Sequence, residues 1–350
     1  MKIAVTCSSK EGLLQEYRRH FQSAQNDAIP PDFFAEGDSD ETLEAVSEAL
    51  HGHGHHVTRI EADDTATDRL LALQPDLVFN IAEGLFGDFR ESYIPMLCER
   101  LSIPYTGSDP LTLGICLNKV RCKEVLSFNR IANAEFRVFQ PDQAVVLDGF
   151  SFPAIVKPVA EGSSKGIFDD SVVEDRANAI RLIAEKMKIY HQPVLLEQFL
   201  AGDEFTVAMW GNRPHVRVLP VVAMRYDTLP AGAKPIYSYE AKWIWDTREK
   251  PLDIFQCPAK ISESLRLSIE KTVLSAYHVL GIRDWCRIDV RLDKQGEPHI
   301  LELNPLPGIL PNPEDNSCFP KAARTAGFAY ADMLNHVVQI AAERYHLEMK

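Results

Sequence analysis

Apolar runs and amphipathic stretches alternate along the first third of the chain. Residues 40–51 place apolar side chains at helical spacing after a suitable cap residue, Ser39 or Asp40. Three compact apolar runs predict buried strands, at residues 2–6, 57–60 and 77–80. Strand–helix–strand alternation predicts a parallel sheet with sites at the carboxyl ends of its strands. A turn-rich stretch at residues 22–40 predicts a loop or irregular insert.

The pattern changes after about residue 107 and predicts a second α/β part. A strand at residues 152–158 leads directly into a loop rich in glycine and serine, and a hairpin pairs residues 286–292 with 299–304. Helices are predicted at residues 118–126, 176–190, 263–280 and 330–344, and a further strand at residues 193–199. We therefore expect an α/β protein without internal repeats.

Composition and charge exclude several classes of protein. The chain has 350 residues, 45% hydrophobic and 25% charged, which suits two or three ordinary globular domains. Its net charge of −13 disfavours nucleic acid and anionic membranes as partners, because both are bound through Lys and Arg. No apolar run approaches the roughly 20 residues of a membrane span. The amino terminus is unlike a signal peptide, so we expect a cytoplasmic location.

Two features raise the question of a bound metal. Seven scattered cysteines contain no C-x-x-C pair and do not indicate a zinc site. The sequence HGHGHH at residues 51–56 is rich in histidine, but its glycines favour a helix end followed by an exposed turn. We therefore expect no metal site at either feature.

The loop EGSSKG at residues 161–166 follows the predicted strand that ends at Pro158. Small residues expose backbone N–H groups and let a polyphosphate come close, while neighbouring lysines add positive charge. The spacing is not that of a P-loop, and no G-x-G-x-x-G dinucleotide fingerprint occurs. On its own such a loop is either a phosphate site or a simple turn.

Polar side chains line one face of the predicted hairpin. With a period of two, Arg287 and Asp289 share a face of one strand, and Glu302 and Asn304 share a face of the other. Pairing across the short turn would place Asp289 close to Glu302, and two such carboxylates repel unless a cation or proton lies between them. Carboxylate and amide oxygens are ligands that Mg²⁺ prefers, although an exposed polar face is the alternative. The next turn ends at Gly308, whose N–H suits an oxyanion beside a magnesium nucleotide.

Five motifs occur in a fixed order: KPVAEGSSKG at 157–166, EQFLAGDEFTV at 197–207, YEAK at 239–242, RID at 287–289 and ELN at 302–304. Together they resemble the ATP-grasp superfamily, and specifically its D-alanine–D-alanine ligase-like family. The resemblance runs from about residue 77 to the carboxyl end. It implies an ATP-grasp fold after an amino-terminal parallel α/β domain, with domains at residues 1–107, 108–196 and 197–350.

The resemblance implies a role for each matching position. The residues expected to hold ATP are Lys119, Lys157, Ser163, Ser164, Glu197, Leu200, Glu204 and Lys242. Asp289, Glu302 and Asn304 match the ligands of two Mg²⁺ ions, with Mn²⁺ as an alternative. The catalytic positions are Arg287 and Gly308, which stabilise the tetrahedral intermediate, and Ser163 in the closing loop. Ser317 resembles the serine that receives the carboxylate of the second amino acid.

The chain departs from the family where the first substrate is held. Glu36 falls near the place of the glutamate that holds the first ammonium, and Glu83-Gly84 replaces the usual histidine–glycine pair. Trp243 replaces a tyrosine, and its indole, which only donates, cannot serve as the same hydroxyl partner to Ser163. We therefore expect an intact ATP site and an altered amino-acid site that includes Glu36, Trp243 and Ser317.

These features predict an ADP-forming ligase that activates a carboxylate as an acyl phosphate and joins it to an amine. Its partners would be small-molecule carboxylates and amines, with amino acids as the expected class, and the resemblance adds a homodimer. D-alanyl-D-alanine is one candidate product. The alternatives are a hydroxyl or carrier-thiol acceptor, and a non-catalytic ATP-binding regulatory protein, which the retained Arg287 disfavours.

Overall fold

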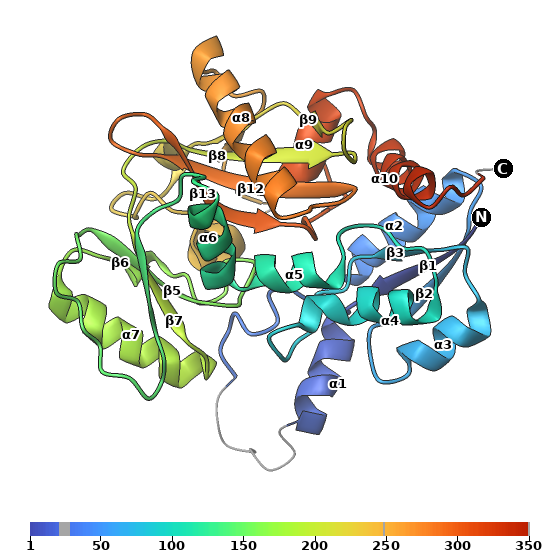
Figure 1. Cartoon of the computed structure of the whole chain (residues 1–350), viewed down its shortest axis with the longest axis horizontal. Coiled ribbons are helices and arrows are strands. Elements are labelled where there is room, and N and C mark those ends of the chain that lie inside the picture. The colour runs from blue at the N-terminus through green and yellow to red at the C-terminus, as the bar shows by residue number, and fades with distance from the viewer. Residues whose placement is uncertain (21–28, 248, 349–350) are drawn as a thin grey trace.

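The computed structural model describes residues 1–20, 29–247 and 249–348, and three sheets organise them (Figure 1). The first sheet is parallel, in the order β2-β1-β3, with β1 (Lys2–Cys7) paired to both neighbours. Its other strands are β2 (His56–Glu61) and β3 (Leu77–Asn80), and its helices are α1 (Lys10–His20), α2 (Asp40–Gly52), α3 (Ala66–Leu73) and α4 (Tyr93–Leu101). The predicted parallel sheet is confirmed.

The second sheet is antiparallel, in the order β4-β7-β5-β6. Its strands are β4 (Phe136–Phe139), β5 (Ala154–Pro158), β6 (Val172–Val173) and β7 (Val194–Gln198). Helix α7 (Arg176–Tyr190) packs on β5 and β7, and its inward side chains share a core with the sheet. Two helices, α5 (Pro110–Leu117) and α6 (Lys119–Phe128), precede this sheet in the chain.

The third sheet has six strands and carries Arg287 and the three expected metal ligands. Its main path is β11-β10-β8-β12-β13, with β9 beside β8. The strands are β8 (Glu204–Trp210), β9 (Arg217–Val218), β10 (Val222–Met224), β11 (Phe255–Gln256), β12 (Trp285–Leu292) and β13 (Pro298–Asn304). The helices of this part are α8 (Glu263–Val279), α9 (Cys318–Thr325) and α10 (Tyr330–Arg344). Short helical turns occur at η1 (Arg90–Ser92), η2 (Asp169–Ser171) and η3 (Tyr226–Thr228), and a π-helix at η4 (Ala241–Trp245).

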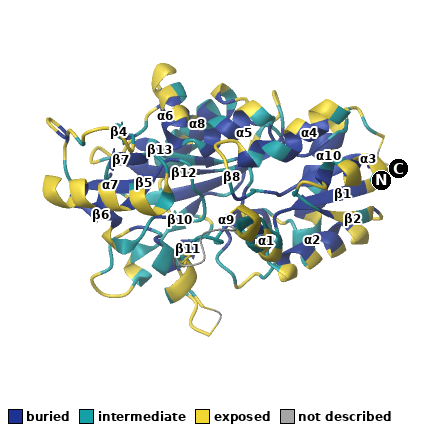
Figure 2. Cartoon of the chain, turned by 90° about the horizontal axis from the view of Figure 1, so that it is seen from below, coloured by how far each residue is buried: buried dark blue, intermediate teal, exposed yellow. Residues whose placement is uncertain are grey.

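One continuous apolar core joins the first and third sheets. Phe79 of β3 meets Trp285 of β12 edge to face, with ring centroids 5.7 Å apart. Trp285 also contacts Phe319 of α9, and α10 returns to pack against α2. Figure 2 shows this buried interior along the strands, with exposed residues mainly on outer helices and loops. The packing fixes the amino-terminal sheet relative to the hairpin of β12 and β13.

The elements with a predicted range match it to within two residues, and α7 and α10 match at both ends, whereas α3, α4, α5 and α9 had no predicted range. Ser39 caps α2 by accepting the N–H of Thr42 at 3.1 Å. α2 ends at Gly52, as the histidine-rich stretch indicated, although His55 of that stretch is buried. Helix α1 was not predicted, because Gly12 and the surrounding charged residues weaken its pattern. The predicted insert lies partly outside the described residues, and the domain boundaries stay a prediction.

No helix within the described ranges is long and apolar enough to cross a membrane.

Asp284 links the first and third sheets to the last helix, although it is fully buried. Its carboxylate accepts the N–H of Gly107 at 2.8 Å, the amide of Asn212 at 2.8 Å and two N–H groups of Arg344 at 2.8 and 3.0 Å. Donors from three distant segments therefore converge on one side chain.

We expect Asp284→Ala to destabilise the protein by about 3–5 kcal/mol, because it leaves the guanidinium of Arg344 without its buried partner. Asp284→Asn is the matched control, since it keeps an acceptor and tolerates the left-handed backbone (φ 62°) at this position. Denaturant unfolding of the two variants measures the difference. Equal midpoints for the alanine variant and the wild type would contradict this role.

Candidate active site

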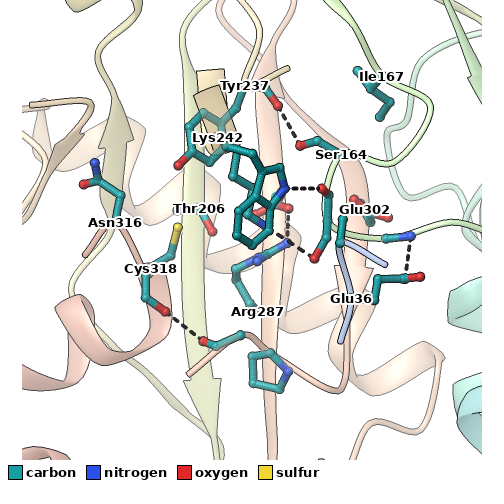
Figure 3. A pocket seen from close by; sticks show the side chains of 18 of the residues that line it. Glu36, Ser164, Ile167, Thr206, Tyr237, Lys242, Arg287, Glu302, Asn316 and Cys318 are labelled. Atoms are coloured by element: carbon teal, nitrogen blue, oxygen red, sulfur yellow. Dashed lines mark hydrogen bonds and ion pairs between the residues drawn. The ribbon is translucent and has the colours of Figure 1, made fainter. Parts of the chain in front are cut away.

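A cavity of about 460 Å³ lies where the three sheets meet. The third sheet contributes Arg287 and Glu302, the loop after β5 contributes Ser164, and the amino-terminal part contributes Glu36, all labelled in Figure 3. Side chains separated by more than two hundred positions in the sequence therefore face one another. The sequence placed these residues in one site, and the fold brings them to one cavity.

The hairpin has the predicted register. Asp289 lies opposite Glu302 and Arg287 lies opposite Asn304, with a bulge after Asp289. The guanidinium of Arg287 donates to Asp289 at 3.0 Å, and the amide of Asn304 donates to the same carboxylate at 3.3 Å. The ammonium of Lys119, at the start of α6, is 2.6 Å from the Glu302 carboxylate. Cations from separate elements therefore hold the two carboxylates side by side.

Lys119 favours the ionised form of Glu302. Burial opposes ionisation of Glu302, but the ion pair with Lys119 outweighs it and holds the pKa of Glu302 below its usual value. Burial alone would lower the pKa of Arg287, but the neighbouring Asp289 carboxylate outweighs burial and raises it. Two carboxylates and an amide on adjacent strands form the all-oxygen donor set that suits Mg²⁺.

A second buried ion group lies beneath the cavity. Glu197 of β7 is 1% exposed and lies 2.7 Å from the ammonium of Lys157 and 3.0 Å from that of Lys123. Burial alone would raise the pKa of Glu197, but the two lysines hold it below its usual value. Sequence analysis missed Lys123, although it follows Lys119 by one helical turn and shares its face of α6.

The loop at residues 161–166 has an unusual backbone. Ser163 and Ser164 have φ values of 49° and 61°, and Gly166 has 73°. The hydroxyl of Ser164 donates to the carbonyl of Tyr237 at 2.8 Å, and the ammonium of Lys242 donates to the Ser163 hydroxyl at 3.4 Å. The loop and the segment carrying Lys242 therefore form two adjoining walls of the cavity (Figure 3).

Trp243 contacts the same loop through its indole N–H, which can only donate a hydrogen bond. Its indole N–H donates to the backbone carbonyl of Ser163 at 3.2 Å, rather than to the hydroxyl. The side chain lies in the π-helix and is 38% exposed. An indole therefore still connects the two walls of the cavity where the family usually has a phenol.

The connection between β7 and β8 borders the cavity at its other end. Leu200 lies in this connection and is buried, and Glu204 opens β8. Arg291 donates to the Glu204 carboxylate at 2.8 Å, and its guanidinium stacks over Phe199 at 4.4 Å. Burial raises the pKa of Glu204, while Arg291 acts in the opposite direction. An apolar wall with an acid at its edge suits a base and a ribose.

At the amino-terminal end of the cavity, Glu36 already has partners. Its carboxylate accepts from the Arg90 guanidinium at 2.5 Å and from the N–H of Gly162 at 2.8 Å. Burial opposes its ionisation, but Arg90 holds the pKa of Glu36 below its usual value. Sequence analysis missed Arg90, for which no local pattern gives a signal, because the contact spans 54 positions.

Two further acids, Glu83 and Glu91, lie beside Glu36. One oxygen from each of the three carboxylates lies within 4.8 Å of the others. Burial raises the pKa of Glu91 to about 7, and burial together with Glu36 holds the pKa of Glu83 well above its usual value. Glu83 lines the cavity and has no hydrogen bond or ion pair within the described part of the chain. These three neighbouring carboxyl groups favour a positively charged ligand.

Ser317 and Gly308 lie together at the turn after β13. The Ser317 hydroxyl donates to the carbonyl of Gly308 at 3.1 Å and accepts the N–H of Leu310 at 3.2 Å. Both residues line the cavity, and the hydroxyl of Ser317 holds the turn in shape. Whether Ser317 also contacts a substrate carboxylate stays a prediction.

Comparisons with known proteins agree with this geometry. A family model described as the D-ala D-ala ligase C-terminus matches residues 124–339. A D-alanine–D-alanine ligase of Haemophilus ducreyi is 32% identical, over 85% of this chain and 91% of the relative. A protein of Sinorhizobium fredii described as uncharacterized, y4sG, is 30% identical over 99% of this chain and 98% of its own length.

Solved structures have the same fold. The D-alanine–D-alanine ligase of Bacillus anthracis complexed with ATP superposes with a TM-score of 0.70 at 20% identity, covering 99% of both chains. Another structure of that ligase gives a TM-score of 0.72 at 19% identity, with the same coverage. Likeness at this identity establishes the ATP-grasp fold of the chain.

Asp38, which lines the cavity, provides a test of its electrostatics. Burial raises the pKa of Asp38 to about 7, although the N–H of Ser8 donates to it at 3.1 Å. A raised folded-state pKa means that the contribution of Asp38 to stability is present below pH ~4 and lost as the pH rises through about 7.

We therefore expect Asp38→Asn to stabilise the protein by about 1 kcal/mol at pH 8 and to have no such effect at pH 4, since the amide still accepts from Ser8 but carries no buried charge. Thermal unfolding at both pH values measures this. A gain of equal size at pH 4 and pH 8 would rule out charge as the cause.

Proposed function

Because the chain belongs to the D-alanine–D-alanine ligase family and is an ATP-grasp carbon–nitrogen ligase, we propose that it activates an amino-acid carboxylate as an acyl phosphate and joins it to the amine of a second amino acid. One observation carries the proposal. Three lysines, the paired carboxylates of the hairpin and Arg287 line a single cavity. Phosphoryl transfer needs positioning and charge neutralisation, which such a set supplies.

In this proposal the lysines bind the nucleotide phosphates. Lys119, Lys157 and Lys242 come from three different elements and point at one region. Burial lowers the pKa of Lys242 and Arg287 adds to that effect, so an arriving anion would be strongly favoured. Ser163 and Ser164 would close over the phosphates, with Glu197, Leu200 and Glu204 at the adenosine end.

Asp289, Glu302 and Asn304 would hold Mg²⁺, as one or two ions. When bound, the metal neutralises phosphate charge. Lys119 would exchange part of its contact with Glu302 for a phosphate oxygen. The guanidinium of Arg287 and the N–H of Gly308 would stabilise the negative charge that develops on the carbonyl oxygen when the amine attacks.

We further propose that the first amino acid binds differently here from in typical family members. Glu36, near the position expected for the ammonium ligand, is instead paired with Arg90 and Gly162. Glu83 replaces the expected histidine, lines the cavity and has no hydrogen bond or ion pair within the described residues. An ammonium that arrived there would restore the charge of Glu83, which burial disfavours.

The deciding experiment is phosphate release from ATP and Mg²⁺ across D- and L-amino acids, singly and in pairs, with products identified by mass spectrometry. Hydroxy acids and thiols are included as acceptors. An amide product with one phosphate per amide supports the proposal. Turnover only with hydroxy acids or thiols would replace the amine acceptor, and ATP binding without turnover on any pair would overturn the catalytic proposal.

We expect Asp289→Asn and Glu302→Gln to lower turnover by about a thousandfold, because each removes a negatively charged metal ligand. Steady-state rates measured against Mg²⁺ concentration test this. Glu297→Gln, an exposed acid on the same hairpin, is the matched control and should behave as wild type. Normal kinetics in either site variant would refute the metal assignment.

Glu83→Gln should raise KM for the first amino acid by about tenfold or more while leaving KM for ATP nearly unchanged, because it removes charge and keeps shape. Asp88→Asn, exposed in the same loop, is the control. Glu83→His adds a test of specificity by restoring the usual family residue, and should shift preference toward D-alanine. Unchanged KM values in Glu83→Gln would exclude Glu83 from substrate binding.

A further inference from the structure

The connection between α1 and α2 contacts the glycine- and serine-rich loop through a buried acid, Asp32. Its Oδ2 accepts the N–H of Gly166 at 2.7 Å and the hydroxyl of Tyr190 at 2.6 Å. Asp32 is 0% exposed. In Figure 1 the blue part of this connection, from residue 29 onward, runs up beside the green second sheet. A residue of the amino-terminal part therefore holds a loop of the central part.

Asp32 is anchored to the amino-terminal part by its neighbours. Phe33 packs edge to face on Tyr17 of α1, with ring centroids 5.1 Å apart, and lies 6.3 Å from the ring of Phe86. The ammonium of Lys165, within the loop, lies over the Phe33 ring, 4.5 Å from its centroid. These contacts give Asp32 a rigid support from which to hold Gly166.

The peptide groups of Gly166 are bound from both sides. Its N–H donates to Asp32, and its carbonyl accepts from the ammonium of Lys186 at 2.5 Å. Gly166 has a φ of 73°, and a Cβ there would lie 2.4 Å from the ring of Pro158. The end of the loop is therefore held in one conformation by the Asp32 carboxylate, the Lys186 ammonium and the ring of Pro158.

The same connection also reaches the segment that carries Lys242. The hydroxyl of Tyr239 donates to the carbonyl of Pro31 at 2.8 Å. Four residues beyond Asp32, Glu36 accepts the N–H of Gly162 at the other end of the loop. Three contacts from one short stretch, residues 31–36, therefore hold both walls that bear the phosphate-facing side chains.

Asp32 is poorly explained as a stabilising residue. Its second oxygen, Oδ1, is buried without a hydrogen-bond partner in the described residues. A buried carboxylate with an unsatisfied oxygen costs stability. Its geometry is instead that of a support for the loop, because both of its hydrogen bonds end at the loop or at the helix behind it.

We propose that Asp32 is a positioning residue that holds the 161–166 loop closed over the phosphate site, so that the amino-terminal part controls access of water to the acyl phosphate. This inference rests on the proposed function. If the loop opens, water attacks the acyl phosphate and returns the free carboxylate and inorganic phosphate, so that ATP is consumed without amide formation.

Hydrogen exchange tests the positioning without any turnover. In Asp32→Ala, amide exchange in the peptide covering residues 160–167 should become about tenfold faster, while a peptide from β12 stays unchanged. Tyr190→Phe, which removes one hydroxyl and keeps the ring, should give a smaller increase and serves if the alanine variant does not fold. Asp142→Ala, an exposed acid, is the control. Unchanged exchange in a folded Asp32→Ala or in Tyr190→Phe would overturn the proposal.

The ratio of phosphate released to amide formed tests whether opening of the loop lets water reach the acyl phosphate. The wild type should release about one phosphate per amide, and Asp32→Ala should release about twice as much or more, with a lower kcat and a smaller change in KM for ATP. A ratio equal to that of the wild type would overturn the control of water access. If the wild type makes no amide from any pair, the proposed function fails, whereas the exchange experiment still decides the role of Asp32.

Discussion

The structure depends on two carboxylates that are forced together on neighbouring strands. Asp289 and Glu302 face each other across the hairpin, where their repulsion would disfavour the pairing if they stood alone. Two cations compensate for this repulsion: Arg287, two residues before Asp289 on the same strand, and Lys119, at the start of α6. The site therefore exists only when the central helices are docked on the third sheet, and its charges are already balanced before a nucleotide arrives.

The same arrangement recurs around the cavity. Glu197 of the second sheet is held by Lys123 and Lys157, and Glu36 of the amino-terminal part is held by Arg90. Each pair is buried, so the loss of one member leaves an uncompensated charge. In the proposed function, a polyanion and divalent cations would replace part of these internal partners. Binding would then exchange one set of ion pairs for another, which suits a site that must both bind and release a nucleotide.

Much of this site could be predicted from local pattern. The period-two alternation around Asp289 and Glu302 predicted both their shared face and their pairing, and the structure confirms it. Small residues after β5 predicted a loop that exposes its backbone N–H groups, and the structure adds that Ser163 and Ser164 there have positive φ values. Helix α1 was not predicted, because glycine and charged residues obscure its helical period. The roles of Arg90 and Asp32 were not predicted, because their partners lie far away in the sequence.

The sequence by itself determined the strongly periodic elements, the faces of the hairpin strands and the family, because periodicity, turn chemistry and motif spacing are recorded locally along the chain. The tertiary structure decided which charges meet. With 37 Lys and Arg and 50 Asp and Glu, charge alone does not select Lys119 for Glu302 or Arg90 for Glu36. The first pairing follows from the apolar core that α6 shares with β12 and β13, and the second from the fold of the amino-terminal part, which brings together residues 54 positions apart.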